Sequence, residues 1–243
     1  MGSNPTLGVK IIGDCMPEKI QYENIIKKLK SLSNPKAVEG MARFGINPKN
    51  TYGVSIPNLR GLAKEIGRNH NLAQKLWLSG IHEARILAGM IDDPEMVMEK
   101  QMDDWIKDFD SWDVCDQVCM NLFDKVPFAF EKAIRLTAEK KEFVRRSGFA
   151  LMACLACHDK TSSDEKFKRF FPSIKKYSTD DRNFVRKAVN WALRQIGKRN
   201  KNLNREAIKT AKEILKMDSK AARWIAKDAI RELESSSIQK RLK

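Results

Sequence analysis

A short basic string recurs along the chain at the spacing of a helical repeat. Phe-Val-Arg-Arg at residues 143–146 reappears 41 residues later as Phe-Val-Arg-Lys at 184–187. Ala-Arg-Trp at 222–224 and Ala-Arg-Ile at 84–86 are related strings. A period of about 40 residues with two helices in each unit is typical of helical repeat proteins. Because one such unit cannot bury its apolar face alone, the sequence predicts neighbouring units that stack into a curved body.

The spacing of apolar residues predicts helices along almost the whole chain, and no segment shows the strict alternation of a strand. Asn34-Pro35, Val126-Pro127 and residues 92–94 separate one helix from the next, while Ser111 and Ser163 are suited to cap N-termini. Short connections make consecutive helices antiparallel neighbours. The expected helices span 18–32, 35–44, 55–69, 71–79, 82–91, 95–108, 112–123, 127–139, 141–157, 164–176, 181–198, 203–215 and 218–234.

These patterns together predict an all-α solenoid of the HEAT-like or armadillo type. We expect one repeat domain over residues 18–235, an N-terminal extension over 1–17 and a C-terminal tail over 236–243. In such a solenoid the second helix of each unit lines the concave side. The repeated string would place Arg145, Arg146 and Lys187 on that side, and we therefore expect a basic concave face. Ion pairs between repeats are the alternative role for these arginines.

The charge balance narrows the choice of partner. The chain has 46 Lys and Arg residues against 31 Asp and Glu residues, which gives a net charge of +15. A surplus of this size on a folded domain favours nucleic acid as the partner. An anionic membrane surface and a merely solubilising lysine-rich surface are the weaker alternatives. No apolar run reaches the roughly 20 residues of a membrane span, and residues 1–17 lack the pattern of a signal peptide.

The five cysteines do not predict a cofactor. Cys154, Cys157 and His158 match a haem-attachment motif, but they end an expected helix whose apolar spacing favours core positions. A zinc site that joined them to Cys115 and Cys119 would lack the usual spacing of structural zinc ligands. Without an export signal the thiols should stay reduced. We therefore expect neither metal nor haem, and a location in a bacterial-type cytoplasm or nucleoid.

Carboxylates, aromatic rings and arginines are the groups available for chemistry. The chain has three histidines and lacks a Gly-rich phosphate-binding loop, so histidine-based acid–base catalysis is not expected. Asp116 lies four residues after Trp112, which puts carboxylate and indole on one helical face. The plainer alternative is a surface aspartate beside a half-buried tryptophan. Trp191 and Arg194 share a face of a later helix because they are three residues apart.

Four strings of the chain resemble the AlkD-type DNA alkylation-repair glycosylases, and their order and spacing are intact over roughly residues 18–235. They are Gly-Val-Ser-Ile-Pro-Asn-Leu-Arg at 53–60, Ser-Gly-Ile-His-Glu-Ala-Arg at 79–85, Ser-Trp-Asp-Val-Cys-Asp at 111–116 and Lys-Ala-Val-Asn-Trp-Ala-Leu-Arg at 187–194. The resemblance implies a HEAT-like solenoid that holds duplex DNA in a basic cleft. It also implies excision of purines alkylated at N3 or N7, without a deep pocket for the base.

The resemblance also implies roles for individual residues. Trp112, Asp116 and Trp191 match the catalytic set of the family, in which a carboxylate stands with two aromatic rings. Arg146 and Arg194 match residues near the DNA backbone, and Arg145 and Lys187 extend that set through the repeated string. Two positions depart from the family. Cys154 stands where relatives can carry a lysine, and Phe44 takes the place of an N-terminal tyrosine that helps to frame the site.

The chemistry of an alkylated purine suits these residue types. A purine alkylated at N3 or N7 is positively charged and leaves without a strong general acid, so the difficult species is the oxocarbenium-like sugar. A carboxylate such as Asp116 can stabilise that sugar and orient water, and each indole can attract the cation by about 0.5–2 kcal/mol. We expect a glycosylase that acts as a monomer on duplex DNA without a cofactor. The alternatives are a non-catalytic protein that binds damaged or branched DNA, and a helical scaffold for an acidic protein.

Overall fold

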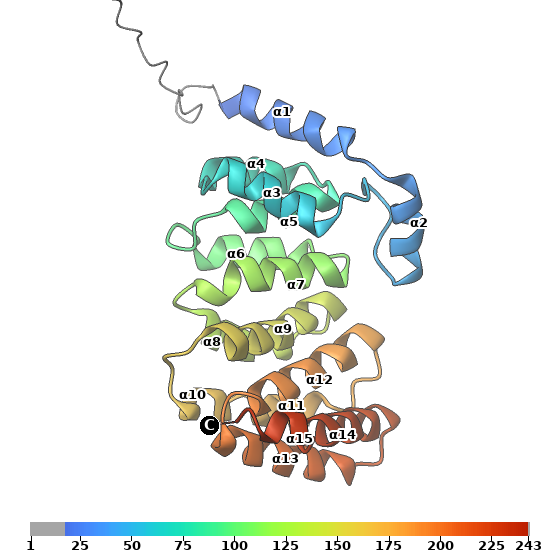
Figure 1. Cartoon of the computed structure of the whole chain (residues 1–243), viewed down its shortest axis with the longest axis vertical. Coiled ribbons are helices and arrows are strands. Elements are labelled where there is room, and N and C mark those ends of the chain that lie inside the picture. Colours follow the sequence, from blue (N-terminus) through green and yellow to red (C-terminus); the bar gives the residue numbers. More distant parts are fainter. Residues whose placement is uncertain (1–17, 243) are drawn as a thin grey trace, which may run out of the picture.

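The computed structural model describes the backbone of residues 18–242 and the side chains of residues 21–242. Its regular secondary structure in this range is helical throughout, which confirms the all-α prediction (Figure 1). The N-terminal extension over residues 1–17 lies outside the described residues. In chain order the elements are α1 (Glu18–Ser31), α2 (Pro35–Arg43), α3 (Ile56–Ile66), α4 (His70–Leu78), α5 (His82–Ile91), α6 (Glu99–Lys107), α7 (Trp112–Asn121), the 3-10 turn η1 (Phe123–Lys125), α8 (Ala129–Thr137), α9 (Glu142–His158), α10 (Asp164–Lys168), α11 (Phe171–Tyr177), α12 (Asn183–Gly197), α13 (Lys201–Leu215), α14 (Lys220–Leu233) and α15 (Ser236–Gln239).

The helices stack along one long axis in two layers (Figure 1). Helices α5, α7, α9, α12 and α14 pack on one another in that order and form what we call the second-helix layer. The partner layer contains α4, α8, α11 and α13, each packed against the second helix of its own pair. Helix α6 joins this partner layer, since Trp105 of α6 stacks on Trp77 of α4 with ring centroids 4.1 Å apart. This two-layer stack confirms the HEAT-like solenoid predicted from the repeat.

Close packing between the layers depends on one glycine of the longest helix. A Cβ at Gly148 of α9 would lie 2.8 Å from the Ala133 carbonyl oxygen and 2.8 Å from the Thr137 amide nitrogen, both in α8. Glycine is therefore required where α9 crosses α8. This contact seats α9 between α7 and α12, and α9 carries Arg145 and Arg146 in its first two turns.

Two local predictions differ from the structure. The helix expected over 164–176 is divided into α10 and α11, because Pro172 in the first turn of α11 has no amide hydrogen and its ring clashes with a preceding turn. Ser111 and Ser163 occupy N-cap positions but form no capping hydrogen bond. The Ser111 hydroxyl donates to the Asp113 carboxylate instead, at 2.9 Å.

Helix α2 stands apart from the stack and has no buried residue (Figure 1). The connection that follows α2 is anchored by the buried Glu83 of α5, whose carboxylate accepts hydrogen bonds from the backbone amides of residues 52–54. At the other end, Gly45 adopts a φ of +78°, and a Cβ there would lie 2.5 Å from a ring carbon of Phe184. Helix α2 is thus held at its C-terminal tip, against the second-helix layer.

Residues 236–242, predicted as part of a tail, fold back on the last repeat. Gln239 of α15 donates hydrogen bonds to the Asn204 side chain and the Leu233 carbonyl, and Leu242 is buried. None of the described helices is long and apolar enough to cross a membrane.

Candidate nucleic-acid interface

The centre of the candidate site is an ion pair between two repeats. Arg146 of α9 donates from Nε to Oδ1 of Asp116 at 2.9 Å and from Nη2 to Oδ2 at 2.7 Å. Nη1 of the same guanidinium donates to the Phe184 carbonyl of α12 at 2.5 Å. Arg146 therefore ties three helices of the second-helix layer together, and its planar fork fixes the orientation of the Asp116 carboxylate.

Trp112 and Phe44 join this pair. The Arg146 guanidinium lies 6.0 Å from the centroid of the Trp112 ring, and the indole Nε1 donates to the backbone carbonyl of Phe44 at 3.1 Å. Phe44 ends α2 and its ring is 74% exposed. The structure thus brings Trp112, Asp116, Arg146 and Phe44 together, and we call these four residues the α7–α9 cluster. Phe44 contributes a carbonyl that holds Trp112, together with an exposed ring.

Trp191 lies farther along the second-helix layer. It is on α12, seven residues after Phe184, which corresponds to about 10 Å along a helix axis. Its ring is half-buried and packs against the apolar core. Within the described side chains it makes no hydrogen bond or ring contact with Trp112 or Asp116. Trp191 thus lies on α12, in the same layer as Trp112 and Asp116, and its role beside Asp116 stays a prediction.

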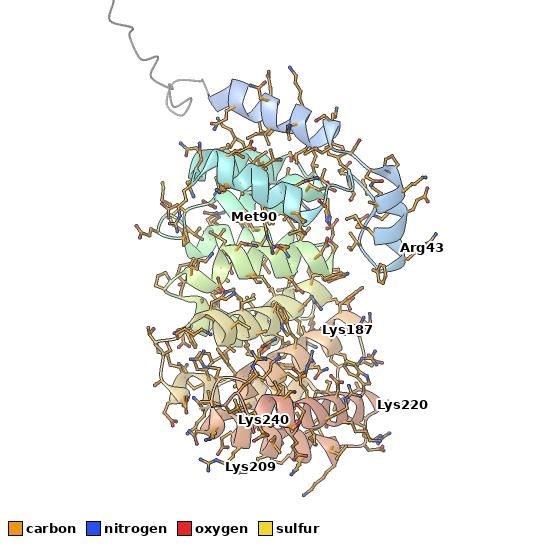
Figure 2. All side chains as sticks on the ribbon, viewed as in Figure 1. Arg43, Met90, Lys187, Lys209, Lys220 and Lys240 are labelled. Carbon is orange, nitrogen blue, oxygen red and sulfur yellow. The ribbon has the colours of Figure 1, made fainter. Side chains whose placement is uncertain are left out.

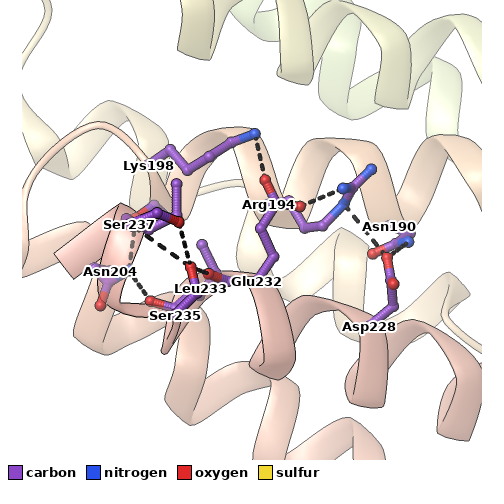
Figure 3. A network of polar contacts seen from close by, with 11 residues as sticks. Asn190, Arg194, Lys198, Asn204, Asp228, Glu232, Leu233, Ser235 and Ser237 are labelled. Atoms are coloured by element: carbon purple, nitrogen blue, oxygen red, sulfur yellow. Dashed lines mark hydrogen bonds and ion pairs between the residues drawn. The ribbon is translucent and has the colours of Figure 1, made fainter. Parts of the chain in front are cut away.

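Two of the predicted DNA-contacting arginines are engaged in ion pairs between repeats. Arg145 pairs with Asp180 at 2.7 Å, donates to the Thr137 carbonyl at 2.9 Å and lies over the Tyr177 ring. Arg194 hydrogen-bonds Glu232 of α14, and its Nε lies 3.7 Å from Asp228 of the same helix (Figure 3). For these two arginines, and for Arg146, the structure contains the inter-repeat pairs that the sequence left open as the alternative to a basic track. Their contact with DNA remains a prediction.

Lys187 is arranged differently. It is exposed at the start of α12, and no ion pair forms with it among the described residues. Figure 2 shows Lys187 on the same edge of the molecule as Arg43 of α2 and Lys220 of α14. These exposed cations lie on the side of the molecule where helices α12 and α14 begin, and we call the three the basic edge.

Burial sets the protonation behaviour of Asp116. Loss of solvation raises the pKa of its carboxyl above the ordinary value of 3.8. The charge and hydrogen bonds of Arg146 oppose this rise, and the nearby charge of Asp113 adds to it. A buried carboxyl with a raised pKa and a single arginine partner is the type of group that occurs at functional sites.

The cysteines occupy core positions for the most part. Cys115, Cys119 and Cys154 are free and buried, and burial raises the pKa of the Cys119 and Cys154 thiols well above 9.0. The Cys119 and Cys154 thiols are therefore protonated, uncharged parts of the core. Cys154, which stands where relatives can carry a lysine, presents no charge to the second-helix layer. Cys157 is half-buried, and the His158 ring bonds the buried carboxylate of Asp124.

Two backbone carbonyls that bond residues of the α7–α9 cluster could not be predicted from the pattern of side chains in the sequence. The carbonyls of Phe44 and Phe184 are backbone acceptors, and they reach the cluster through contacts between residues that are distant in the sequence. The repeated string did point to α12, because Phe184 begins its second copy. Nothing in the sequence indicated that its carbonyl would accept from Arg146.

Comparison with solved structures supports the fold. One is a member of a new family of proteins related to the HEAT-like repeat DNA glycosylases with affinity for branched DNA structures. It superposes with a TM-score of 0.72 at 22% identity, over 87% of this chain and 94% of the other. Two designed armadillo repeat proteins match with TM-scores of 0.36 and 0.35, at 15% and 14% identity; they cover 72% and 75% of this chain and 92% and 87% of their own. No curated protein matches the sequence.

The sequence itself matches a family over most of its length. The match extends over residues 25–233, and so includes every residue of the α7–α9 cluster together with Trp191 and Arg194. The protein therefore belongs to the family of DNA alkylation repair enzymes.

Proposed function

We propose that the protein is a DNA glycosylase that releases purines alkylated at N3 or N7 from duplex DNA. The observation that carries this proposal is the α7–α9 cluster, in which one buried carboxylate is oriented by Arg146 beside an indole. The cluster lies in the second-helix layer of a solenoid that belongs to the DNA alkylation repair family.

The geometry suits a reaction whose leaving group is already positively charged. Asp116 offers a carboxylate that is 14% exposed and fixed in orientation, and each of its oxygens has lone-pair capacity beyond the bond to Arg146. It can stabilise the oxocarbenium-like sugar and orient a water molecule. The Trp112 ring can attract the same cation through its electron-rich face.

The basic edge is suited to hold the DNA backbone. Arg43, Lys187 and Lys220 are exposed and lie along one side of the molecule (Figure 2). Lysines and arginines in such a line bind phosphates without regard to sequence, and the affinity falls steeply as salt rises. Arg145, Arg146 and Arg194 already pair with carboxylates and so rigidify the layer. In this proposal any contact that they make with DNA is additional to those pairs.

A second candidate function is binding of branched DNA without catalysis. The structural match described above is to a protein related to HEAT-like repeat glycosylases with affinity for branched DNA structures. One feature of this chain favours the same function: the Trp112 indole N–H and both Asp116 oxygens already have partners within the protein. A cluster that is satisfied internally would serve as a rigid wall of a DNA-binding surface.

Release of free base from duplex DNA that carries N7-methylguanine decides between the two functions. The wild-type protein should release the base faster than it is lost spontaneously, and Asp116→Asn should lower the rate by at least about 100-fold. Asp180→Asn is the matched control, because it also removes a buried carboxylate that pairs with an arginine of α9. This control should retain most of the rate.

Two further outcomes complete the test. Robust DNA binding by the wild-type protein with no release above the spontaneous rate would overturn the glycosylase proposal and support the second candidate. Should Asp116→Asn not fold, the double variant Asp116→Asn with Arg146→Gln removes both charges of the pair together. An unchanged rate in a folded variant of either kind would exclude Asp116 from the reaction.

A further inference from the structure

Arg186 is bound differently from the other arginines of the repeated string. Arg145 and Arg146 each pair with an aspartate, whereas the Arg186 guanidinium lies over the Trp224 ring, 4.8 Å from its centroid. Its Nη2 makes a 3.3 Å contact with the side-chain oxygen of Asn183, and its Nε is buried without a hydrogen-bond partner. Within the described side chains none of these contacts involves a carboxylate. The positive charge of Arg186 is therefore not neutralised locally.

Trp224 is the partner that sets this arginine apart. Its side chain is 39% exposed, while Trp77 and Trp105 are buried and Trp112 and Trp191 are half-buried. A large aromatic ring at the surface exposes apolar area that folding would otherwise bury, and such rings are enriched where proteins bind partners. Together, Arg186 and Trp224 place a cation and an aromatic ring side by side, and we call this pair the α12–α14 platform.

The platform lies in the same layer as the α7–α9 cluster but is separate from it. Helix α7 and helix α14 are separated by α9 and α12 in the stack. Three steps of about 8–10 Å between packed helices put Trp224 about 24–30 Å from Trp112. Arg186 is nearer, on α12, two residues after Phe184, whose carbonyl bonds Arg146. Lys187 follows Arg186 in α12, and Lys220 precedes Trp224 by one helical turn in α14. The platform therefore adjoins the basic edge, where the DNA backbone is proposed to run.

We propose that the α12–α14 platform binds an unpaired nucleotide of a DNA strand. The indole stacks on the base through the face that Arg186 does not cover, and Arg186 with Lys220 binds the adjoining phosphates. Bases stacked on aromatic side chains contribute about 1–3 kcal/mol each, with little dependence on sequence. The faces of bases within an intact duplex are covered by their neighbours, so the platform distinguishes gapped or flapped DNA from continuous duplex. This inference rests on the proposed binding of DNA but not on base excision.

The test compares two unmodified DNAs that carry a fluorescent label. One is a continuous duplex, and the other is the same duplex with a short single-stranded gap. Wild-type protein should bind the gapped DNA more tightly, and Trp224→Ala should lower that affinity about 5- to 150-fold while affecting the continuous duplex much less. Trp224→Phe should restore most of the preference, since a phenyl ring still stacks. Arg186→Ala should weaken binding of both DNAs and weaken the gapped one more.

Matched controls separate the platform from general surface effects. Leu78→Ala removes another exposed apolar side chain, on α4, and Arg205→Ala removes an exposed cation of α13 in the partner layer. Both should leave the preference for gapped DNA unchanged. Thermal unfolding of each variant shows that the fold is retained.

The outcomes are distinguishable from failure of the proposed function. An equal preference in wild type and folded Trp224→Ala would overturn the platform, whether or not the protein excises methylated bases. Quenching of the Trp224 fluorescence by an acidic polypeptide, and not by gapped DNA, would also overturn it, because the platform would then serve a protein partner. If the wild-type protein binds neither DNA, the proposed function is overturned, and the platform with it.

Discussion

Two neighbouring arginines of helix α9 each form an ion pair with an aspartate, and the pKa values of the two aspartates shift in opposite directions. Arg145 pairs with Asp180 of the following repeat, and Arg146 pairs with Asp116 of the preceding repeat. Burial would raise the pKa of Asp180, but hydrogen bonds from Arg182 and Arg145 outweigh it and hold that pKa below 3.8. Burial raises the pKa of Asp116, which has one arginine partner.

The two aspartates therefore differ in the number of arginines that bond them, and their pKa values shift in opposite directions. Asp180, with two arginines, is ionised at neutral pH at a gain in stability. Burial of Asp116 opposes its ionisation and raises its pKa, and it stands beside an aromatic ring in the layer proposed to face DNA. Local departures from the most stable arrangement are expected at functional sites. The contrast between two otherwise similar pairs points to Asp116.

The largest difference in stability between the two ion pairs is expected when the aspartate of each pair is replaced by alanine. Asp116→Ala leaves the buried Arg146 with the Phe184 carbonyl as its remaining hydrogen-bond acceptor, and should lower the free energy of unfolding by about 3–5 kcal/mol. Asp180→Ala should cost less, because Arg145 keeps the Thr137 carbonyl and the Tyr177 ring. Urea unfolding of both variants measures this difference. Equal losses would show that the two pairs are equivalent supports of the stack.

The comparison also shows which parts of the molecule could be predicted from the sequence. The repeated string and the apolar period predicted the two-layer stack, because both reflect burial between neighbouring repeats. The four-residue spacing of Trp112 and Asp116 predicted that they lie on one helical face, and the structure adds Arg146 as a neighbour of both. Pairs within one helix depend only on helix geometry, and that geometry is fixed.

Contacts between repeats were less predictable. Arg145 and Arg146 are adjacent and chemically identical, yet they pair with aspartates 35 and 30 positions away in opposite directions along the chain. Which aspartate each one reaches depends on how the neighbouring helices are seated, and glycine contacts such as that of Gly148 with α8 decide this. The spacing of residues along the sequence does not indicate how one helix is rotated relative to the next.

A smaller effect on stability is expected at the C-terminal tip of α2. This tip contacts the surroundings of the Asp116–Arg146 pair and not those of the Asp180–Arg145 pair. Gly45→Ala places a Cβ against the Phe184 ring in a left-handed backbone conformation, which should cost about 1–3 kcal/mol and detach the tip from Trp112. Gly40→Ala, inside α2, is the control, because its Cβ would meet no atom within 4 Å. Trypsin should then cleave after Arg43 faster in the first variant than in the second. Equal cleavage rates would mean that the tip is held by other contacts.

The smallest effects, on the order of 1 kcal/mol for each unit of pKa shift, concern pH and have opposite signs for the two pairs. The folded pKa of Asp180 is lowered, so its stabilising contribution is present above 3.8 and is lost as pH falls through the folded pKa. The folded pKa of Asp116 is raised, so its contribution is present below 3.8 and is lost as pH rises through the folded pKa.

The free energy of unfolding of the wild type minus that of Asp180→Asn should therefore increase with pH in the acid range. The corresponding difference for Asp116→Asn should decrease with pH, over a window above 3.8. Urea unfolding at a series of acidic pH values measures both differences, and slopes of the same sign would show that Arg146 stabilises the Asp116 carboxylate as strongly as two arginines stabilise Asp180.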